Sequence, residues 1–177
     1  LSTARIMRGL TLPARQRFRR IGVRRVLLTS LEIVQPTISR WDEVHGNVLI
    51  DDGIEWEDER LELIHGSLMA GKKVSIKLPR LETVVGDLRT HVLRRCRVDA
   101  PNLRQIGGNM HVGSKLPPRL EIIGGSLHIH HLRAVSLKTL EFIGGTLEII
   151  GSRGVRADAL ESVGGDLRLL PSNLFFH

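Results

Sequence analysis

Several residue types are scarce or missing in this sequence of 177 residues. There is no tyrosine, and aromatic residues make up only 3% of the chain, so its core must be built from leucine, isoleucine and valine. The single cysteine, Cys96, cannot form an internal disulfide. This argues against a disulfide-stabilised extracellular domain and favours a reducing compartment, either the cytoplasm or the inside of a host cell. No apolar run approaches the roughly 20 residues that cross a bilayer, so we expect no membrane span.

Acidic residues are absent from residues 1–30, which contain eight arginines. The formal charge of the chain is +7, but beyond residue 30 the acidic side chains outnumber the basic ones by one. Nucleic-acid binding is therefore not expected of the body of the chain. The basic segment is compatible with a phosphate-binding arm, a targeting peptide or a membrane-surface helix. We favour a fourth interpretation, a capping segment over residues 1–40 whose arginines face water or acidic side chains.

A ten-residue pattern, L-x-x-[IV]-x-G-x-[LVM]-x-[IVLAT], occurs seven times between residues 41 and 170. Three copies read LEIIGGSLHI, LEFIGGTLEI and LESVGGDLRL. Successive copies start 17 to 22 residues apart, and four of the six intervals are 20; the starts are Trp41, Leu61, Leu81, Leu103, Leu120, Leu140 and Leu160. Self-similarity at this period predicts a repeat architecture in which each copy stacks on the next.

The alternation of apolar and polar residues at the end of each copy is typical of a strand with one buried face. The sixth position is always glycine, which indicates either a positive φ or a backbone contact too close for a Cβ. We predict a mainly β protein, a parallel β-solenoid of about seven coils over residues 41–170. Residues 171–177, which include Phe175 and Phe176, would cap the far end. Because the chain begins with leucine rather than methionine, we expect a fragment or processed product.

The repeated pattern resembles the L-domain repeats of growth-factor-receptor ectodomains and related bacterial leucine-rich-repeat proteins. The resemblance covers residues 41–170 and implies a right-handed parallel solenoid that binds proteins or peptides, with no catalytic residues. The chain differs from the receptors in lacking their cysteine framework, and from standard leucine-rich repeats in lacking a regular asparagine. It is the resemblance that suggests a bacterial setting, as part of a secreted effector directed at a host.

Template position predicts which side chains share a face of the stacked strands. One outward row is Leu49, Met69, Arg89, His111, His128, Glu148 and Arg168. A second row, two residues further along each strand, is Asp51, Gly71, His91, Gly113, His130, Ile150 and Leu170. The candidate partner-binding residues are Arg89, His91, His111, His128, His130, Glu148 and Arg168.

Three interpretations of the histidines on this face compete. They belong to a solvated surface, to a recognition patch for an acidic or pH-dependent partner, or to a metal site built from His111, His128 and His130. Zinc needs three or four ligands with fixed support, and no cysteine or carboxylate obviously completes this set. We therefore expect no metal site and no cofactor.

An acidic row and the single cysteine are the two remaining features that could carry chemistry. The second template position forms an acidic row, interrupted by Arg104, that runs Asp42, Glu62, Glu82, Glu121, Glu141 and Glu161. Closely spaced carboxylates serve glycoside hydrolysis, but here the repeat itself produces the spacing, and arginines or lysines of neighbouring turns are expected to neutralise the row. Arginines near Cys96 could lower its pKa, although an unreactive thiol, either buried or in a loop, is the simpler expectation.

The sequence thus favours a non-enzymatic module that binds another protein through the exposed sheet face and adjoining loops. The alternatives are a polysaccharide-binding or polysaccharide-cleaving β-helix, and binding of nucleic acid or an acidic surface through the arginine-rich N-terminus. The identity of the partner does not follow from the sequence.

Overall fold

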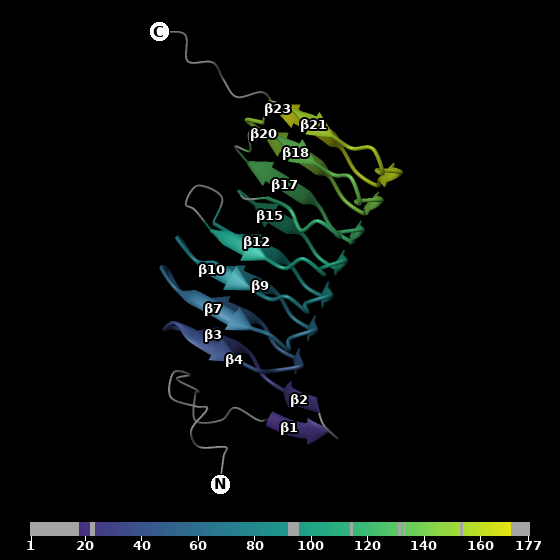
Figure 1. Cartoon of the computed structure of the whole chain (residues 1–177). Coiled ribbons are helices and arrows are strands. Elements are labelled where there is room, and N and C mark those ends of the chain that lie inside the picture. The colour runs from purple at the N-terminus through teal and green to yellow at the C-terminus, as the bar shows by residue number, and fades with distance from the viewer. Residues whose placement is uncertain are drawn as a thin grey trace.

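The computed structural model of the chain describes residues 18–21, 24–91, 96–113, 115–130, 132, 134–152 and 154–170. Every element in these residues is a β-strand, and the strands stack into a solenoid (Figure 1). In this part of the chain there is consequently no helix of the length and hydropathy that would cross a membrane. The predicted mainly β fold, with about seven stacked coils in residues 41–170, is confirmed.

Each coil turns from a short strand into a second, usually longer strand, so that two long sheets run the length of the solenoid. The nine-stranded sheet contains, in spatial order, β1 (Phe18–Ile21), β2 (Arg24–Leu27), β5 (Glu43–Val44), β8 (Leu63–Ile64), β11 (Thr83–Val84), β14 (Gln105–Ile106), β16 (Ile122–Ile123), β19 (Phe142–Ile143) and β22 (Ser162–Val163). The eight-stranded sheet contains β3 (Leu31–Ile33), β6 (Val48–Ile50), β9 (Leu68–Ala70), β12 (Leu88–Thr90), β15 (Met110–Val112), β17 (Leu127–His130), β20 (Leu147–Ile150) and β23 (Leu167–Leu170).

Two smaller sheets close the remaining side of the coils. One contains β4 (Thr37–Ser39), β7 (Glu55–Asp58), β10 (Ser75–Lys77) and β13 (Arg97–Asp99), and the other pairs β18 (Val135–Ser136) with β21 (Val155–Arg156). The two extra residues of the 22-residue interval lie between β12 and β13. The 17-residue interval is shortened after β15, where the four-stranded sheet has already ended. Both length changes therefore lie between strands, and the register of the long sheets continues through them.

The parallel stack begins before the first copy of the repeat. Strands β2, β3 and β4 pair in parallel with β5, β6 and β7, so residues 24–39 have the geometry of a coil. They lie in the segment predicted as a basic N-terminal cap. Strand β1 pairs antiparallel with β2 and is the one antiparallel neighbour among the described strands. Residues 1–17 and the predicted C-terminal cap, residues 171–177, lie outside the described residues.

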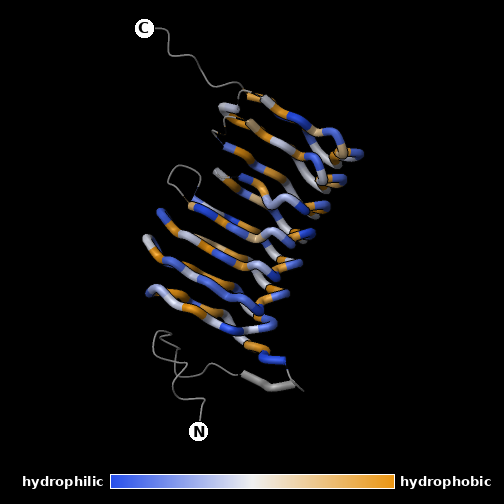
Figure 2. The backbone as a smooth tube through the Cα atoms, viewed as in Figure 1, coloured by the Kyte–Doolittle hydropathy of each residue, from blue (hydrophilic) through white to orange (hydrophobic). Residues whose placement is uncertain are grey.

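The core is one aliphatic column shared by all coils. Leucines at the first template position and the apolar residues at the fourth and eighth positions point inward, as in Leu61, Ile64 and Leu68, each at most 1% exposed. The alternation of apolar and polar residues along each strand is visible in Figure 2. Stacking is what buries these side chains, because a single coil has no second layer to cover its apolar edge.

Close backbone packing explains the obligatory glycine. None of the seven sixth-position glycines has a positive φ; the described glycines that do are Gly53 and Gly151. A Cβ built on Gly125 would lie 2.8 Å from the backbone carbonyl of Gly108 in the preceding coil, nearer than real Cβ atoms approach backbone. Of the two predicted explanations, the contact too close for a Cβ is therefore the correct one.

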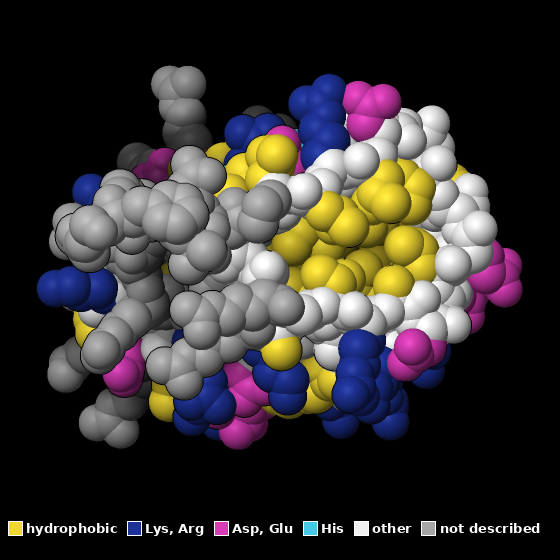
Figure 3. Space-filling model, turned by 90° about the horizontal axis from the view of Figure 1, so that it is seen from above, with side chains coloured by type: hydrophobic (Ala, Val, Ile, Leu, Met, Phe, Trp, Pro, Cys, Tyr) yellow, Lys and Arg dark blue, Asp and Glu magenta, His cyan; other side chains and the backbone are white. Residues whose placement is uncertain are grey.

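The described part of the column is open at its C-terminal end. Viewed along the axis in Figure 3, apolar side chains are exposed at this end. The last coil contributes Leu167 and Leu169, which are 61% and 55% exposed, and the partly buried Leu160 and Val163.

Candidate functional site

The predicted outward row lies on the eight-stranded sheet, with its members directly opposite one another. The register pairs Met69 with Arg89, His111 with His128, and Glu148 with Arg168, and the other links of the row follow the same order. Arg89 and Arg168 are exposed and the members between them are half-buried. The sequence therefore predicted both the order and the direction of these side chains.

A stacked pair of imidazoles stands at the centre of the row. The rings of His111 and His128 have centroids 4.3 Å apart and planes 10° apart. His128 Nδ1 lies 2.9 Å from Oε2 of Glu148, and this hydrogen bond lowers the pKa of Glu148. A carboxylate thus does lie beside the predicted histidines.

The surroundings of His111 disfavour its charged form. Burial lowers the pKa of His111 first, and the neighbouring positive charges of His128 and Arg89 lower it further. Its Nδ1 is buried and has no hydrogen-bond partner among the described residues. The centre of the row therefore combines an imidazole whose charged form is disfavoured with a carboxylate that is hydrogen-bonded to His128.

The two arginines of the row are each paired with an aspartate of their own coil. Nη2 of Arg89 is 2.6 Å from Asp87, and Nη2 of Arg168 is 2.7 Å from Asp166. Of the second predicted row, His130 pairs in register with Ile150, and its charge acts on His111. His91 follows the end of β12 and its backbone contacts the thiol of Cys96.

Arginines of neighbouring coils neutralise part of the acidic row, as predicted. Asp42 is buried and accepts hydrogen bonds from Arg60 and from the backbone N–H of Arg25. Arg104 donates to Glu121 at 2.5 Å. Backbone hydrogen bonds from Glu62 to Asp42 and from Glu82 to Glu62 show that the row follows the coils.

A hydrogen-bonded ladder that was not predicted runs through the seventh template position. The side-chain oxygen of Asn47 accepts from the backbone N–H of Ser67 at 2.8 Å, and that of Ser67 accepts from Asp87 at 3.0 Å. The same link joins Asp87 to Asn109, Asn109 to Ser126, and Ser126 to Thr146. The signal was present, because every copy has Asn, Ser, Asp or Thr at this position, but the absence of a regular asparagine concealed it.

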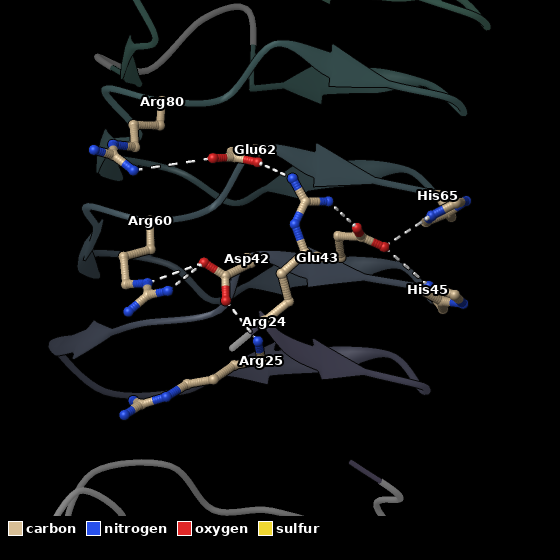
Figure 4. A network of polar contacts seen from close by, with 9 residues as sticks. All are labelled: Arg24, Arg25, Asp42, Glu43, His45, Arg60, Glu62, His65 and Arg80. Carbon is tan, nitrogen blue, oxygen red and sulfur yellow. Dashed lines mark hydrogen bonds and ion pairs between the residues drawn. The ribbon is translucent and has the colours of Figure 1, made fainter. Parts of the chain in front are cut away.

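A second missed feature is a cluster of two histidines and a carboxylate at the turn between the two long sheets (Figure 4). Oε2 of Glu43 lies 3.4 Å from Nε2 of His45 and 3.7 Å from Nε2 of His65. The two rings have centroids 4.2 Å apart with their planes inclined at 46°. Within the described residues this is the one group of three such side chains whose possible ligand atoms all lie within 4.8 Å of each other.

Arg24 orients the carboxylate of this cluster. Its Nη1 donates to Oε1 of Glu43 at 2.7 Å and its Nη2 to Oε2 of Glu62 at 2.9 Å. Burial alone would raise the pKa of Glu43, but hydrogen bonds from His45 and Arg24 lower it below its ordinary value. The available signal was the sequence VHG followed by IHG twenty residues later, with Glu43 two positions before the first histidine.

The thiol of Cys96 is not activated. Burial raises its pKa to about 11, which outweighs the hydrogen bonds that it makes. The hypothesis that nearby arginines lower this pKa is therefore wrong, and the simpler expectation of a buried, unreactive thiol agrees with its 6% exposure. Desolvation favours the neutral thiol over the thiolate.

Comparison of the chain with protein-family models, with curated proteins and with solved structures gives no match in any of the three. The resemblance to leucine-rich-repeat proteins consequently depends on the repeated motif alone.

Proposed function

We propose that the protein is a non-enzymatic repeat module that binds a partner protein through the outer face of its eight-stranded sheet. The observation that carries the proposal is the unbroken outward row from Leu49 to Arg168. Stacked parallel strands hold its side chains in a fixed order, so the face is ordered before a partner arrives and little conformational entropy is lost on binding.

The composition of the row suits a protein interface. Leu49 and Met69 supply apolar contact and are followed by Arg89 and the imidazole pair. Methionine and arginine are among the side chains enriched at protein interfaces. The charges of Arg89 and Glu148 are already compensated by Asp87 and His128. A partner therefore does not have to bury unpaired charges. The desolvation cost of burying them would oppose binding.

A partner with an acidic segment fits the centre of the row. Imidazoles gain positive charge as the pH falls below neutrality, and positive charge on this face would attract carboxylates of the partner. We place this module, by its resemblance to bacterial leucine-rich-repeat proteins, in a secreted effector that acts inside a host cell.

The test is a comparison of charge reversals on two faces. Arg89→Glu, His111→Glu and His128→Glu together alter the proposed interface, whereas Lys77→Glu and Arg97→Glu alter exposed positions on the four-stranded sheet. Host and native lysates are passed over each immobilised variant, and captured proteins are identified by mass spectrometry. We expect the triple variant to lose partners that the wild type and the four-stranded-sheet variant both retain.

Circular dichroism would first establish that both variants keep the β-sheet spectrum. Retention of every specific partner by a folded triple variant would contradict the proposal, as would loss of binding confined to the variant of the four-stranded sheet. A partner that binds more tightly at pH 5.5 than at pH 7.5 would support the acidic segment.

A further inference from the structure

We propose that Glu43, His45 and His65 form a binding site for one divalent transition-metal ion, with Zn²⁺ as the best match. The site lies at the turn between the sheets in the first two copies of the repeat, away from the row proposed to bind a protein. It does not depend on that proposal.

The distances between the ligand atoms fit a metal ion. Zn²⁺ binds histidine nitrogen and carboxylate oxygen at about 2.0–2.2 Å, so two ligands of a tetrahedral ion lie about 3.4 Å apart. The distances from Glu43 Oε2 to the Nε2 atoms of His45 and His65 are 3.4 Å and 3.7 Å. Small rotations of the side chains therefore suffice to bring all three atoms to coordination distance.

The fold fixes the two histidines relative to each other. The backbone N–H of His65 donates to the carbonyl oxygen of Val44 at 2.8 Å, and that of His45 to Leu27 at 2.7 Å. The rings are therefore held one coil apart on adjacent, hydrogen-bonded turns, and their inclination of 46° lets both nitrogens point toward the carboxylate (Figure 4).

The carboxylate of Glu43 is held in place by hydrogen-bonded side chains around it. Arg24 binds Oε1 of Glu43, which leaves Oε2 directed at the histidines. The second nitrogen of Arg24 is bound by Glu62, and this carboxylate offsets the positive charge that would otherwise repel a cation. Hydrogen-bonded partners of this kind orient ligands and raise metal affinity.

Three protein ligands leave one coordination position for water or for a group on another molecule. The side chains of His45 and His65 are each 39% exposed, so that position is open to solvent. The imidazoles on the eight-stranded sheet offer a poorer arrangement. Their planes are almost parallel, and His128 Nδ1 is already engaged with Glu148.

Tag-free protein, treated with chelator and dialysed, is titrated with ZnCl₂ in a calorimeter at pH 7.5. We expect one ion per chain, and we expect a lower affinity in more acidic buffer because protons compete with the metal ion for imidazole nitrogen. His45→Ala and His65→Ala should each weaken binding by about tenfold or more, the size of effect reached even by loss of a supporting group.

The control removes two imidazoles elsewhere, in the double variant His111→Asn and His128→Asn. It should bind Zn²⁺ like the wild type. Visible absorption of bound Co²⁺ gives a second measurement, and should show a site of low coordination number in wild type and control but not in His65→Ala.

Three results would overturn the proposal. They are no stoichiometric binding by folded wild-type protein, undiminished binding by both His45→Ala and His65→Ala, and loss of binding in the control. Because both alanine variants change half-exposed side chains outside the core, circular dichroism can verify that each remains folded.

Discussion

Individual glycines set how closely the coils approach one another. A Cβ at Gly145 or Gly165 would lie within 3.0 Å of backbone atoms in the coil before it, as at Gly125. In the last four copies the preceding residue is also glycine, and a Cβ at Gly144 or Gly164 would meet the carbonyl of the equivalent glycine one coil earlier. Each of these residues is therefore required by a neighbour about twenty positions away in the sequence, and none by its own φ.

Replacing Gly125 with alanine should destabilise the protein by about 2 kcal/mol, because a methyl group forced into a packed site costs roughly 1–3 kcal/mol. The measurement is the free energy of unfolding in urea. The control is Gly154→Ala, since a Cβ at Gly154 meets nothing within 4 Å. This control should leave stability unchanged or raise it by up to about 1 kcal/mol. Equal effects of the two substitutions would contradict the packing explanation.

Elements are joined by side chains as well as by backbone hydrogen bonds. The seventh-position ladder gives the start of β9, β12, β15, β17 and β20 an extra bond to the coil before it, for example from Asn109 N–H to Asp87 at 2.7 Å. This bond is the main reason why the pKa of Asp87 lies below its ordinary value, and the Arg89 guanidinium lowers it further. The ionised carboxylate therefore stabilises the folded state.

Asp87→Asn should flatten the acid side of the stability profile. A carboxylate whose pKa is lowered on folding contributes stability above its unfolded pKa of about 3.9, and this is lost as the pH falls through the lower folded value. The wild type should thus lose more unfolding free energy than Asp87→Asn between about pH 5 and pH 2. At pH 7 the variant should be less stable by about 1 kcal/mol, because a charged acceptor is replaced by a neutral one.

Asp166→Asn is the matched control for this ladder. Asp166 has the same template position and an arginine partner at 2.7 Å, but the structure describes no further coil that would donate to it. Its substitution should change stability much less. Parallel pH profiles for the wild type and Asp87→Asn, measured by urea denaturation at each pH, would show that the ladder contributes nothing through its charge.

At the scale of the whole molecule the solenoid is a one-dimensional stack, in which each coil contacts only its neighbours. Leu61, Leu81 and Leu103 in the middle of the stack are fully buried, whereas Leu167 and Leu169 in the last described coil are mostly exposed. In such proteins local stability is a sum of coil and interface contributions. The last coil has only one interface in the described structure, so it should open first.

Hydrogen exchange followed by mass spectrometry measures how local stability changes from the middle of the stack to its last coil. We expect amides of β9 and β12 to exchange slowest, with protection close to the global free energy of unfolding, and amides of β23 to exchange fastest. A single protection value along the whole chain would show that the coils unfold as one unit. Protection greatest in β23 would instead show that something covers the open end of the column.

The sequence by itself determined the repeat, the inward residues and the order of the outward row. All three depend on periodicity alone: a fixed interval between copies places equivalent residues side by side, and alternation within a strand assigns them to opposite faces. For this reason Arg89, His111, His128 and Glu148 were expected together and are found together.

Only the tertiary structure decided which side chains are in contact and how burial and neighbouring charges shift their pKa values. The template gives a face but no distances. It therefore could not show that Glu43 lies within 4 Å of two imidazoles, or that the sixth-position glycines avoid a collision between coils. Nor could it predict the pKa of Cys96, because the effect of nearby arginines depends on where they point, whereas burial is a property of the assembled column. The direction in which a side chain points follows from its place in the local alternation along a strand. Distances between side chains, their burial and the pairing of their charges arise only when the coils are stacked.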